Sequence, residues 1–208
     1  MSIPTLNEIL AWLPAILAGI TFHEYAHGKV AELLGDNTPR SQGRLTLNPI
    51  SHIDPVGFIM LLIVHFGWAK PVLVNPRNFK NVSFKTGMLL VSLAGPAMNL
   101  ILALISMYIL KYAINMPDSS SRDLIMMIMW PVVEINLILA AFNLIPLPPL
   151  DGSKILAGLL PDSGARLVYS LEPYGPLILL LLIATGATRV VIIPIINYLY
   201  NILCLIVF

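Results

Sequence analysis

The chain has 208 residues, of which 57% are hydrophobic and only 11% are charged, and its mean hydropathy is +0.84. Ordinary soluble domains contain roughly 45–50% apolar and about 25% charged residues, so this composition predicts an integral membrane protein. The net charge of +1 excludes the basic field that attracts nucleic acid, and the single cysteine, Cys204, excludes a disulfide framework and a cysteine zinc cluster. The length predicts one membrane-embedded domain over residues 1–208.

The first apolar segment predicts a helix from about Asn7 to Leu34, long enough to cross a hydrocarbon core of roughly 30 Å at about 1.5 Å per residue. No positive charge precedes it, so we expect it to be retained and not cleaved as a signal peptide. Near its end, His23, Glu24 and His27 form the motif H-E-x-x-H. Residues four apart lie on one face of a helix, so both imidazoles can bind one metal ion while the glutamate reaches a water on that metal. The motif predicts a hydrolytic zinc site.

The next region, Asp36 to Phe84, is mixed in character, because Lys and Arg residues surround a short apolar stretch, Val56–Trp68. This stretch is short for a span and favours a re-entrant or interfacial piece. It leads into Trp68–Pro76, whose prolines forbid a helix and suit an edge strand. We therefore expect a small extended or β element between the first two main spans.

The rest of the chain consists mainly of apolar runs. Spans are predicted at about residues 86–110, which include a turn-like Gly95-Pro96 pair, and at 124–145, with further apolar runs at about 174–187 and 190–208. Prolines after residue 145 stop the third helix and leave an extended stretch that leads to Asp151. The predicted fold is an all-α polytopic bundle of about five to six membrane segments.

Lys and Arg are concentrated between residues 29 and 85, which hold seven of the twelve. Short cytoplasmic loops carry the excess of these residues, so residues 36–85 and 152–172 are predicted to be cytoplasmic and 111–123 to lie outside the plasma membrane. In this orientation the H-E-x-x-H motif and Asp151 fall at similar depths near the cytoplasmic side. The bilayer is therefore an expected partner, and the site should face the cytoplasm.

Catalytic zinc usually takes three protein ligands and leaves a fourth position for water, so the motif needs a third ligand from elsewhere. His52 lies in a turn-rich stretch typical of a hydrogen-bonded loop residue, and His65 closes an apolar run in the manner of an interfacial side chain. Asp151 could be the N-cap of the helix that follows it. A carboxylate at membrane depth needs a partner, however, which favours Asp151 as the third ligand.

Three stretches resemble the signatures of the site-2 protease family of intramembrane zinc metalloproteases. They are His23–His27 in one helix, Gly95–Asn99 in a second, and Asn143–Gly152 after a third. The stretch Gly43–Gly57 also resembles the compact prokaryotic branch without PDZ or CBS domains. The similarity extends over most of the chain.

The resemblance implies one zinc ion bound by His23, His27 and Asp151, with Glu24 as the general base. It also implies that Asn99 contacts the substrate backbone or the oxyanion, and the same motif context favours substrate binding for Asn143. Two further polar residues in the predicted spans, Glu134 and Asn136, are better explained by hydrogen bonds between helices.

These expectations together predict an intramembrane zinc endopeptidase that cuts membrane-spanning proteins near the cytoplasmic face. A substrate helix must unwind first, and Lys70–Pro76 could present an edge to it. Two alternatives stay open. A membrane metal-binding protein or transporter would not need Glu24, and an inactive scaffold is disfavoured because all four chemical residues are present. Nothing in the residues selects a particular substrate.

Overall fold

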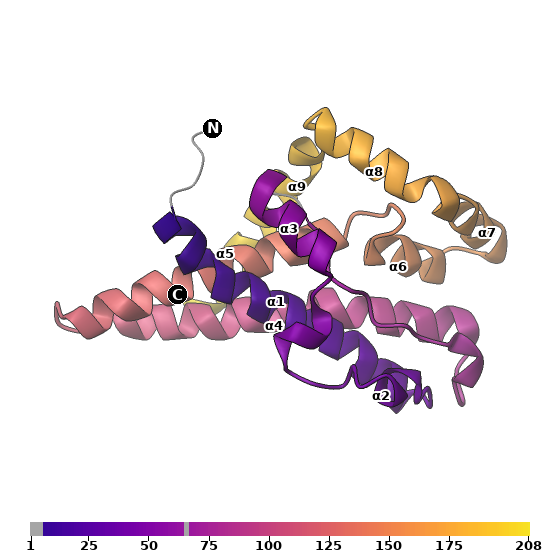
Figure 1. Ribbon diagram of the computed structural model, residues 1–208, viewed down its shortest axis with the longest axis horizontal. Coiled ribbons are helices and arrows are strands. Elements are labelled where there is room, and N and C mark those ends of the chain that lie inside the picture. Colours follow the sequence, from indigo (N-terminus) through magenta and orange to yellow (C-terminus); the bar gives the residue numbers. More distant parts are fainter. Residues whose placement is uncertain (1–5, 65–66) are drawn as a thin grey trace.

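The computed structural model describes residues 6–64 and 67–208, and the described residues form helices and connecting segments without a named strand. The helices, in chain order, are α1 Leu6–Leu33, α2 Thr38–Ser41, η1 Pro49–His52, α3 Pro55–Val64, η2 Pro76–Asn78, α4 Phe84–Ile114, α5 Ser120–Asn143, α6 Asp151–Leu159, α7 Asp162–Ser170, η3 Glu172–Tyr174, α8 Gly175–Ala184 and α9 Ala187–Val207 (Figure 1). The η elements are short 3-10 helices. The predicted all-α class is confirmed.

Four stretches among the described residues are long and apolar enough to cross a membrane: Phe84–Ile114, Ser120–Asn143, Asp162–Ala184 and Ala187–Val207. The protein is therefore a membrane protein. The first predicted span forms a helix, α1, but is not one of the four, so the expected count of five to six membrane segments stays a prediction. The pair Gly95-Pro96 makes no turn, because α4 continues through it as one helix.

The small β element is not confirmed. Between α3 and η2 the described chain is extended, but its only backbone pairing of the β type is an isolated bridge between Ile53 and Ala69. Two later N–H groups of this segment bind side chains: Val72 donates to Glu24 Oε2 at 2.8 Å, and Asn75 donates to Asp36 Oδ2 at 2.7 Å. The carboxylates of Glu24 and Asp36 thus accept hydrogen bonds that the backbone of a neighbouring strand would accept in a sheet.

Asp36 is the anchor of this connection. Its carboxylate is fully buried and also accepts hydrogen bonds from the backbone and hydroxyl of Thr38 and from the amide of Asn78. Burial by itself raises the pKa of Asp36, but these hydrogen bonds outweigh it and hold the pKa below its usual range. The end of α1 is thereby tied to α2 and to η2.

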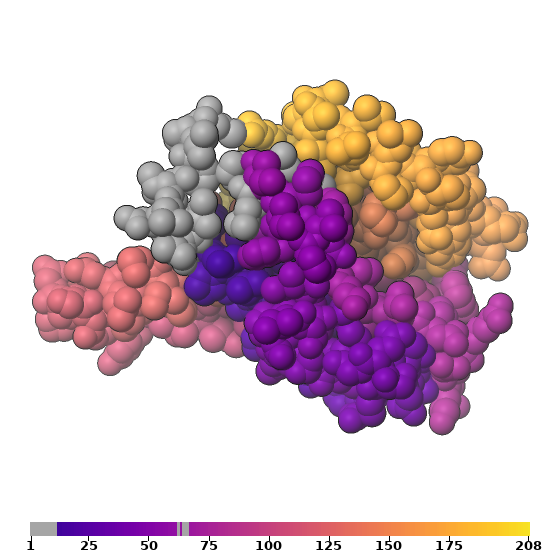
Figure 2. Space-filling model, in the orientation of Figure 1, coloured from indigo at the N-terminus to yellow at the C-terminus, as the bar shows by residue number. Residues whose placement is uncertain are grey.

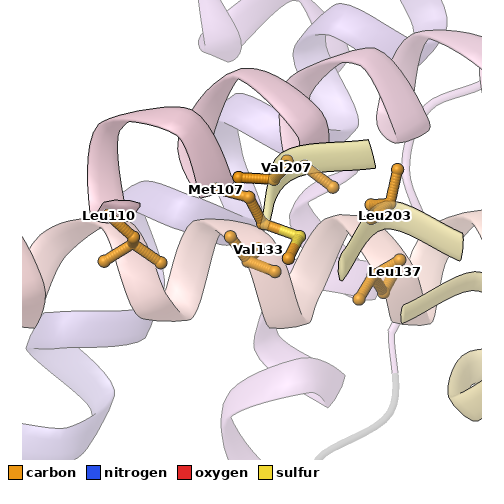
Figure 3. Close-up of a cluster of buried hydrophobic side chains, with 7 residues drawn as sticks. Met107, Leu110, Val133, Leu137, Leu203 and Val207 are labelled. Carbon is orange, nitrogen blue, oxygen red and sulfur yellow. The ribbon is translucent and has the colours of Figure 1, made fainter. Parts of the chain in front are cut away.

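Helices α4, α5 and α9 share a cluster of buried apolar side chains. Their contact consists of interlocked apolar side chains (Figure 3), namely Ala103, Met107, Leu110, Val133, Leu137, Leu203 and Val207. Within a bilayer, such packing stabilises helix association mainly through close van der Waals contact. Large apolar side chains on the outward faces, such as Tyr112 and Leu205, are exposed, as expected of surfaces that meet lipid.

Two lysine hydrogen bonds mark the opposite ends of α4. At one end, the Lys85 ammonium donates to the Leu160 carbonyl, which brings the Lys/Arg-rich segment before α4 beside the loop between α6 and α7. At the other end, Lys111 donates to the Val207 carbonyl near the tip of the α4–α5 hairpin. Figures 1 and 2 show this tip projecting beyond the other elements. The two segments predicted to share one side of the membrane therefore lie together, far from the loop at residues 115–119.

Candidate metal centre

Three side chains from two distant parts of the sequence converge on one point. The Nε2 atoms of His23 and His27 lie 2.9 Å apart, and Asp151 Oδ2 lies 3.2 Å from the first and 3.1 Å from the second. Both imidazoles and the carboxylate are buried. The three predicted ligands thus form a nearly equilateral triangle of donor atoms.

The hydrogen bonds behind the triangle determine which nitrogen of each ring faces it. His23 Nδ1 lies 2.6 Å from Asn99 Oδ1, and His27 Nδ1 lies 2.7 Å from the Val91 carbonyl oxygen. A carbonyl oxygen can only accept, and the amide oxygen of Asn99 does the same, so each Nδ1 carries the proton and donates. Both Nε2 atoms then present lone pairs to the triangle, the tautomer that metal-bound histidines adopt.

This donor set fits zinc. Two lone pairs and a carboxylate oxygen face one another without a proton between them, and Asp151 Oδ2 is buried without a hydrogen-bond partner. Such a cluster is repulsive unless a cation sits among the atoms. Tetrahedral ligands bound at about 2.0–2.1 Å lie about 3.3 Å apart, close to the separations found here.

Asp151 reaches the cluster because of the chain around it. It is the first residue of α6, whose N-cap is Leu150, so the N-cap interpretation of Asp151 is wrong. Next to it, a Cβ on Gly152 would lie 2.3 Å from the Ile145 carbonyl oxygen. Only glycine therefore lets the start of α6 fold back against the end of α5.

Gly95 of α4 lies against the two histidine rings of the metal centre. A Cβ at this position would lie 2.5 Å from His27 Nε2 and 2.6 Å from His23 Nε2. The absence of a side chain leaves room for both rings and for an ion between them. Gly95 therefore allows the His23 and His27 rings to approach the α4 backbone closely. The sequence pattern did not predict this role.

Glu24 lies on α1 directly after the first ligand, and its charge acts on His27. Its Oε2 accepts the Val72 N–H, so the extended segment and the predicted base are joined. The charge of Glu24 also acts on Arg44, whose guanidinium donates to the Ser51 carbonyl at 2.5 Å and to the Lys70 carbonyl. Sequence reasoning named the stretches that contain Val72 and Arg44 but assigned neither residue a contact with Glu24, because such a contact depends on how the segments pack.

Asn99 is fully buried, and its amide is used inside the protein. Besides the bond to His23, its Nδ2 donates to the Gly19 carbonyl at 3.1 Å and to Asn136 Oδ1 at 2.8 Å. The predicted hydrogen bonding of Asn136 between helices is confirmed. A substrate contact by Asn99 stays a prediction, whereas its contact with His23 is part of the structure.

The other candidate residues that the structure describes lie outside the triangle. His52, the last residue of η1, is fully buried and its Nε2 lies 2.8 Å from the Thr46 carbonyl, so its predicted hydrogen bonding is confirmed. His65 lies outside the described residues. Asn143 donates to the Leu139 carbonyl one turn earlier at 3.0 Å, and its substrate contact stays a prediction, as does the interhelical bond of Glu134.

Comparison with known proteins agrees with this chemistry. The model of peptidase family M50 matches residues 113–171, a stretch that includes Asp151. A protein of Bacillus subtilis named "Putative zinc metalloprotease YwhC" is 42% identical over 187 residues, which cover 88% of this chain and 84% of the relative. The chain belongs to peptidase family M50. Its resemblance to the site-2 proteases is thereby confirmed, and it is a membrane zinc metalloprotease.

More distant M50 relatives carry names of the same kind. A protein named Rip2 from Mycolicibacterium smegmatis is 27% identical over 82% of this chain and 65% of its own length. MJ0611 from Methanocaldococcus jannaschii is 30% identical over 69% of this chain and 68% of its own length. Both carry the name "Putative zinc metalloprotease", and no solved structure matches the chain significantly.

Proposed function

We propose that this zinc metalloprotease is an intramembrane endopeptidase that hydrolyses membrane-spanning protein substrates near the cytoplasmic face of the plasma membrane. The observation that carries the proposal is the buried triangle of His23, His27 and Asp151 within a helical bundle, with Glu24 beside it. A protease that cut soluble peptides would not require a catalytic site enclosed by membrane helices.

The depth of the centre supports cleavage near one face. Gly95 lies 11 residues from the start of α4 and 19 from its end, or about 16 Å and about 28 Å along the helix. The nearer end is the Lys/Arg-rich one, which the positive-inside rule assigns to the cytoplasm.

Each residue has a part in the reaction. His23, His27 and Asp151 would hold the zinc ion, which would polarise the scissile carbonyl and lower the pKa of a water toward about 7. Glu24 removes the proton of the attacking water and later delivers it to the leaving nitrogen. The Val72 N–H donates to Oε2 and thereby holds the carboxylate in place beside the ligands.

The metal-binding or transporter alternative does not account for Glu24. A metal carrier needs ligands, whereas a carboxylate held beside them by the Val72 N–H is what a general base requires. The inactive scaffold has no specific observation in its favour.

The Glu24→Gln variant tests the proposal. The amide fits the same space but cannot accept the proton, so we expect zinc content to remain at one per chain and cleavage of a membrane-spanning reporter to fall by about 10²–10⁴. Glu134→Gln, which changes a carboxylate on α5 outside the cluster, is the matched control and should cleave normally. Normal turnover by Glu24→Gln would refute the mechanism.

A further inference from the structure

Arg44 is a buried cation that the metal centre does not account for. It is only 5% exposed, yet no acidic residue in the described part of the chain forms an ion pair with it. Its guanidinium donates instead to two backbone carbonyls, that of Ser51 at 2.5 Å and that of Lys70. Burial of a charge costs free energy, and a neutral donor can satisfy a carbonyl, so stability alone does not require an arginine at this position.

The backbone of Arg44 is fixed close to the metal-binding helix. Its N–H donates to the Pro39 carbonyl at 2.9 Å. The next residue, Leu45, lies over α1 at Gly28, where an added Cβ would lie 2.9 Å from Leu45 Cδ2 and 3.3 Å from Pro39 Cβ. Gly28 directly follows the ligand His27. The Arg44 side chain therefore starts from a fixed place relative to the metal centre.

Arg44 holds the extended segment just before this segment meets the base. The Lys70 carbonyl accepts from Arg44, and the Lys70 N–H donates to the His52 carbonyl at 3.0 Å, so both backbone groups of Lys70 are held. Two residues further on, the Val72 N–H donates to Glu24 Oε2 at 2.8 Å. The contact with Arg44 and the contact with the base thus lie on one short piece of chain.

Pro71 makes the link between these two contacts stiff. A proline ring fixes its own φ at about −65° and restricts the preceding residue to extended conformations. A shift of the Lys70 carbonyl is therefore passed on to the Val72 N–H, because little rotation between them can absorb it. A guanidinium suits this task, since its planar fork holds two carbonyls in fixed directions, whereas an ammonium is a point charge on a flexible stem.

We propose that Arg44 is a positioning residue for the catalytic base: by holding the Ser51 and Lys70 carbonyls, it sets the extended segment so that the Val72 N–H keeps the Glu24 carboxylate in place beside the ligands. The proposal rests on the proposed function, in which Glu24 is the base. It adds a residue that acts on the chemical step through the backbone and not on zinc binding.

The kinetics of Arg44→Gln with the membrane-spanning reporter test this role. We expect kcat per zinc-loaded molecule to fall about 10- to 100-fold, because a catalytic group displaced by about 1 Å can lose about 10² in rate, while KM and zinc affinity stay unchanged. Arg44→Lys can still hold one carbonyl and should restore part of the loss. Arg77→Gln, the same change at an exposed arginine of η2, should cleave normally. A loss confined to zinc affinity or thermal stability, with normal kcat, would refute the positioning role.

A double-mutant cycle tests whether Arg44 acts through Val72. Val72→Pro removes the N–H that Glu24 accepts, and proline suits an extended segment, so this variant should also lower kcat. If Arg44 acts through this N–H, the double variant Arg44→Gln/Val72→Pro should be no slower than Val72→Pro alone. Losses that multiply, or a normal kcat in Val72→Pro, would overturn the proposal.

A change of the link keeps the test decisive even if Arg44→Gln does not fold. Pro71→Gly leaves Arg44 and its acceptors in place but frees the chain between Lys70 and Val72. We expect a lower kcat with zinc retained. Pro76→Gly, the same change beyond the contact with Glu24, should leave kcat unchanged. A normal kcat in Pro71→Gly would exclude transmission through this segment.

Amide hydrogen exchange measures the link without cleavage. In the zinc-loaded protein, the Val72 N–H should exchange about two- to tenfold faster in Arg44→Gln than in the wild type, which corresponds to the loss of one hydrogen bond. An unchanged rate would refute the proposal. The two proposals can fail separately. Normal cleavage by Glu24→Gln refutes the base, whereas an inactive Glu24→Gln together with a normal kcat in Arg44→Gln refutes only the positioning role.

Discussion

Replacing Asn99 by alanine separates two explanations of this residue. The side chain accepts a 2.6 Å hydrogen bond from His23 Nδ1 and donates to Asn136 and to the Gly19 carbonyl. Asn99→Ala removes the oxygen that keeps the proton on Nδ1, so the ring can rotate or move its proton to Nε2, the atom that faces the metal. We therefore expect weaker zinc binding.

The size of the effect follows from these contacts. Loss of a hydrogen-bond partner behind a metal ligand typically costs about 10- to 100-fold in metal affinity, or about 1.4–2.8 kcal/mol. The buried partners left unsatisfied should add about 1–3 kcal/mol of destabilisation. If Asn99 instead donated to the oxyanion, zinc affinity would be unchanged and turnover at saturating zinc would fall about 10²–10³-fold.

The assay is a chelator competition in detergent, with turnover measured at saturating zinc. Asn99→Asp sharpens the comparison, because it keeps an acceptor for His23 but loses the amide donor; it should retain most of the zinc affinity. Ser106→Ala, a buried change two turns further along α4, controls for helix packing and should leave zinc binding unchanged. Wild-type zinc affinity in Asn99→Ala, together with slow turnover, would refute the positioning role.

Three further predictions test other parts of the structure. Gly95→Ala should abolish zinc binding measured by metal analysis, because its Cβ would lie 2.5 and 2.6 Å from the two ligand nitrogens; a variant with full zinc would contradict the close approach. Asp36→Asn should lower the free energy of unfolding by about 1–3 kcal/mol at pH 7. Since the folded pKa of Asp36 is lowered, its carboxylate stabilises the fold above the unfolded pKa of about 3.9, and the difference between variant and wild type should shrink as the pH falls below about 4. A constant difference would exclude this carboxylate as the cause. In a Cys204→Ser background, a cysteine at position 119 should be labelled from outside the cell, and labelling only from the cytoplasm would reverse the proposed orientation.

The sequence by itself was sufficient for the local features. The spacing of His23 and His27 determines a shared helix face, and apolar runs of about 20 residues determine membrane helices. The excess of Lys and Arg before α4 predicts which loops share a side of the membrane. Each of these depends on residues close together in the chain, so each can be recognised before the fold is known.

Tertiary structure decided the contacts between distant segments. Asp151 was equally suited to cap its own helix, and only the fold of α6 against α5 turns its carboxylate toward the histidines. Asn99 lies 76 residues from His23, and Val72 lies 48 residues from Glu24. The amino-acid sequence does not predict these hydrogen-bond partners, because a hydrogen bond between helices depends on how the helices pack. The same packing explains why the expected edge strand is a segment held by carboxylates: its N–H groups donate to Glu24 on α1 and to Asp36 just beyond α1.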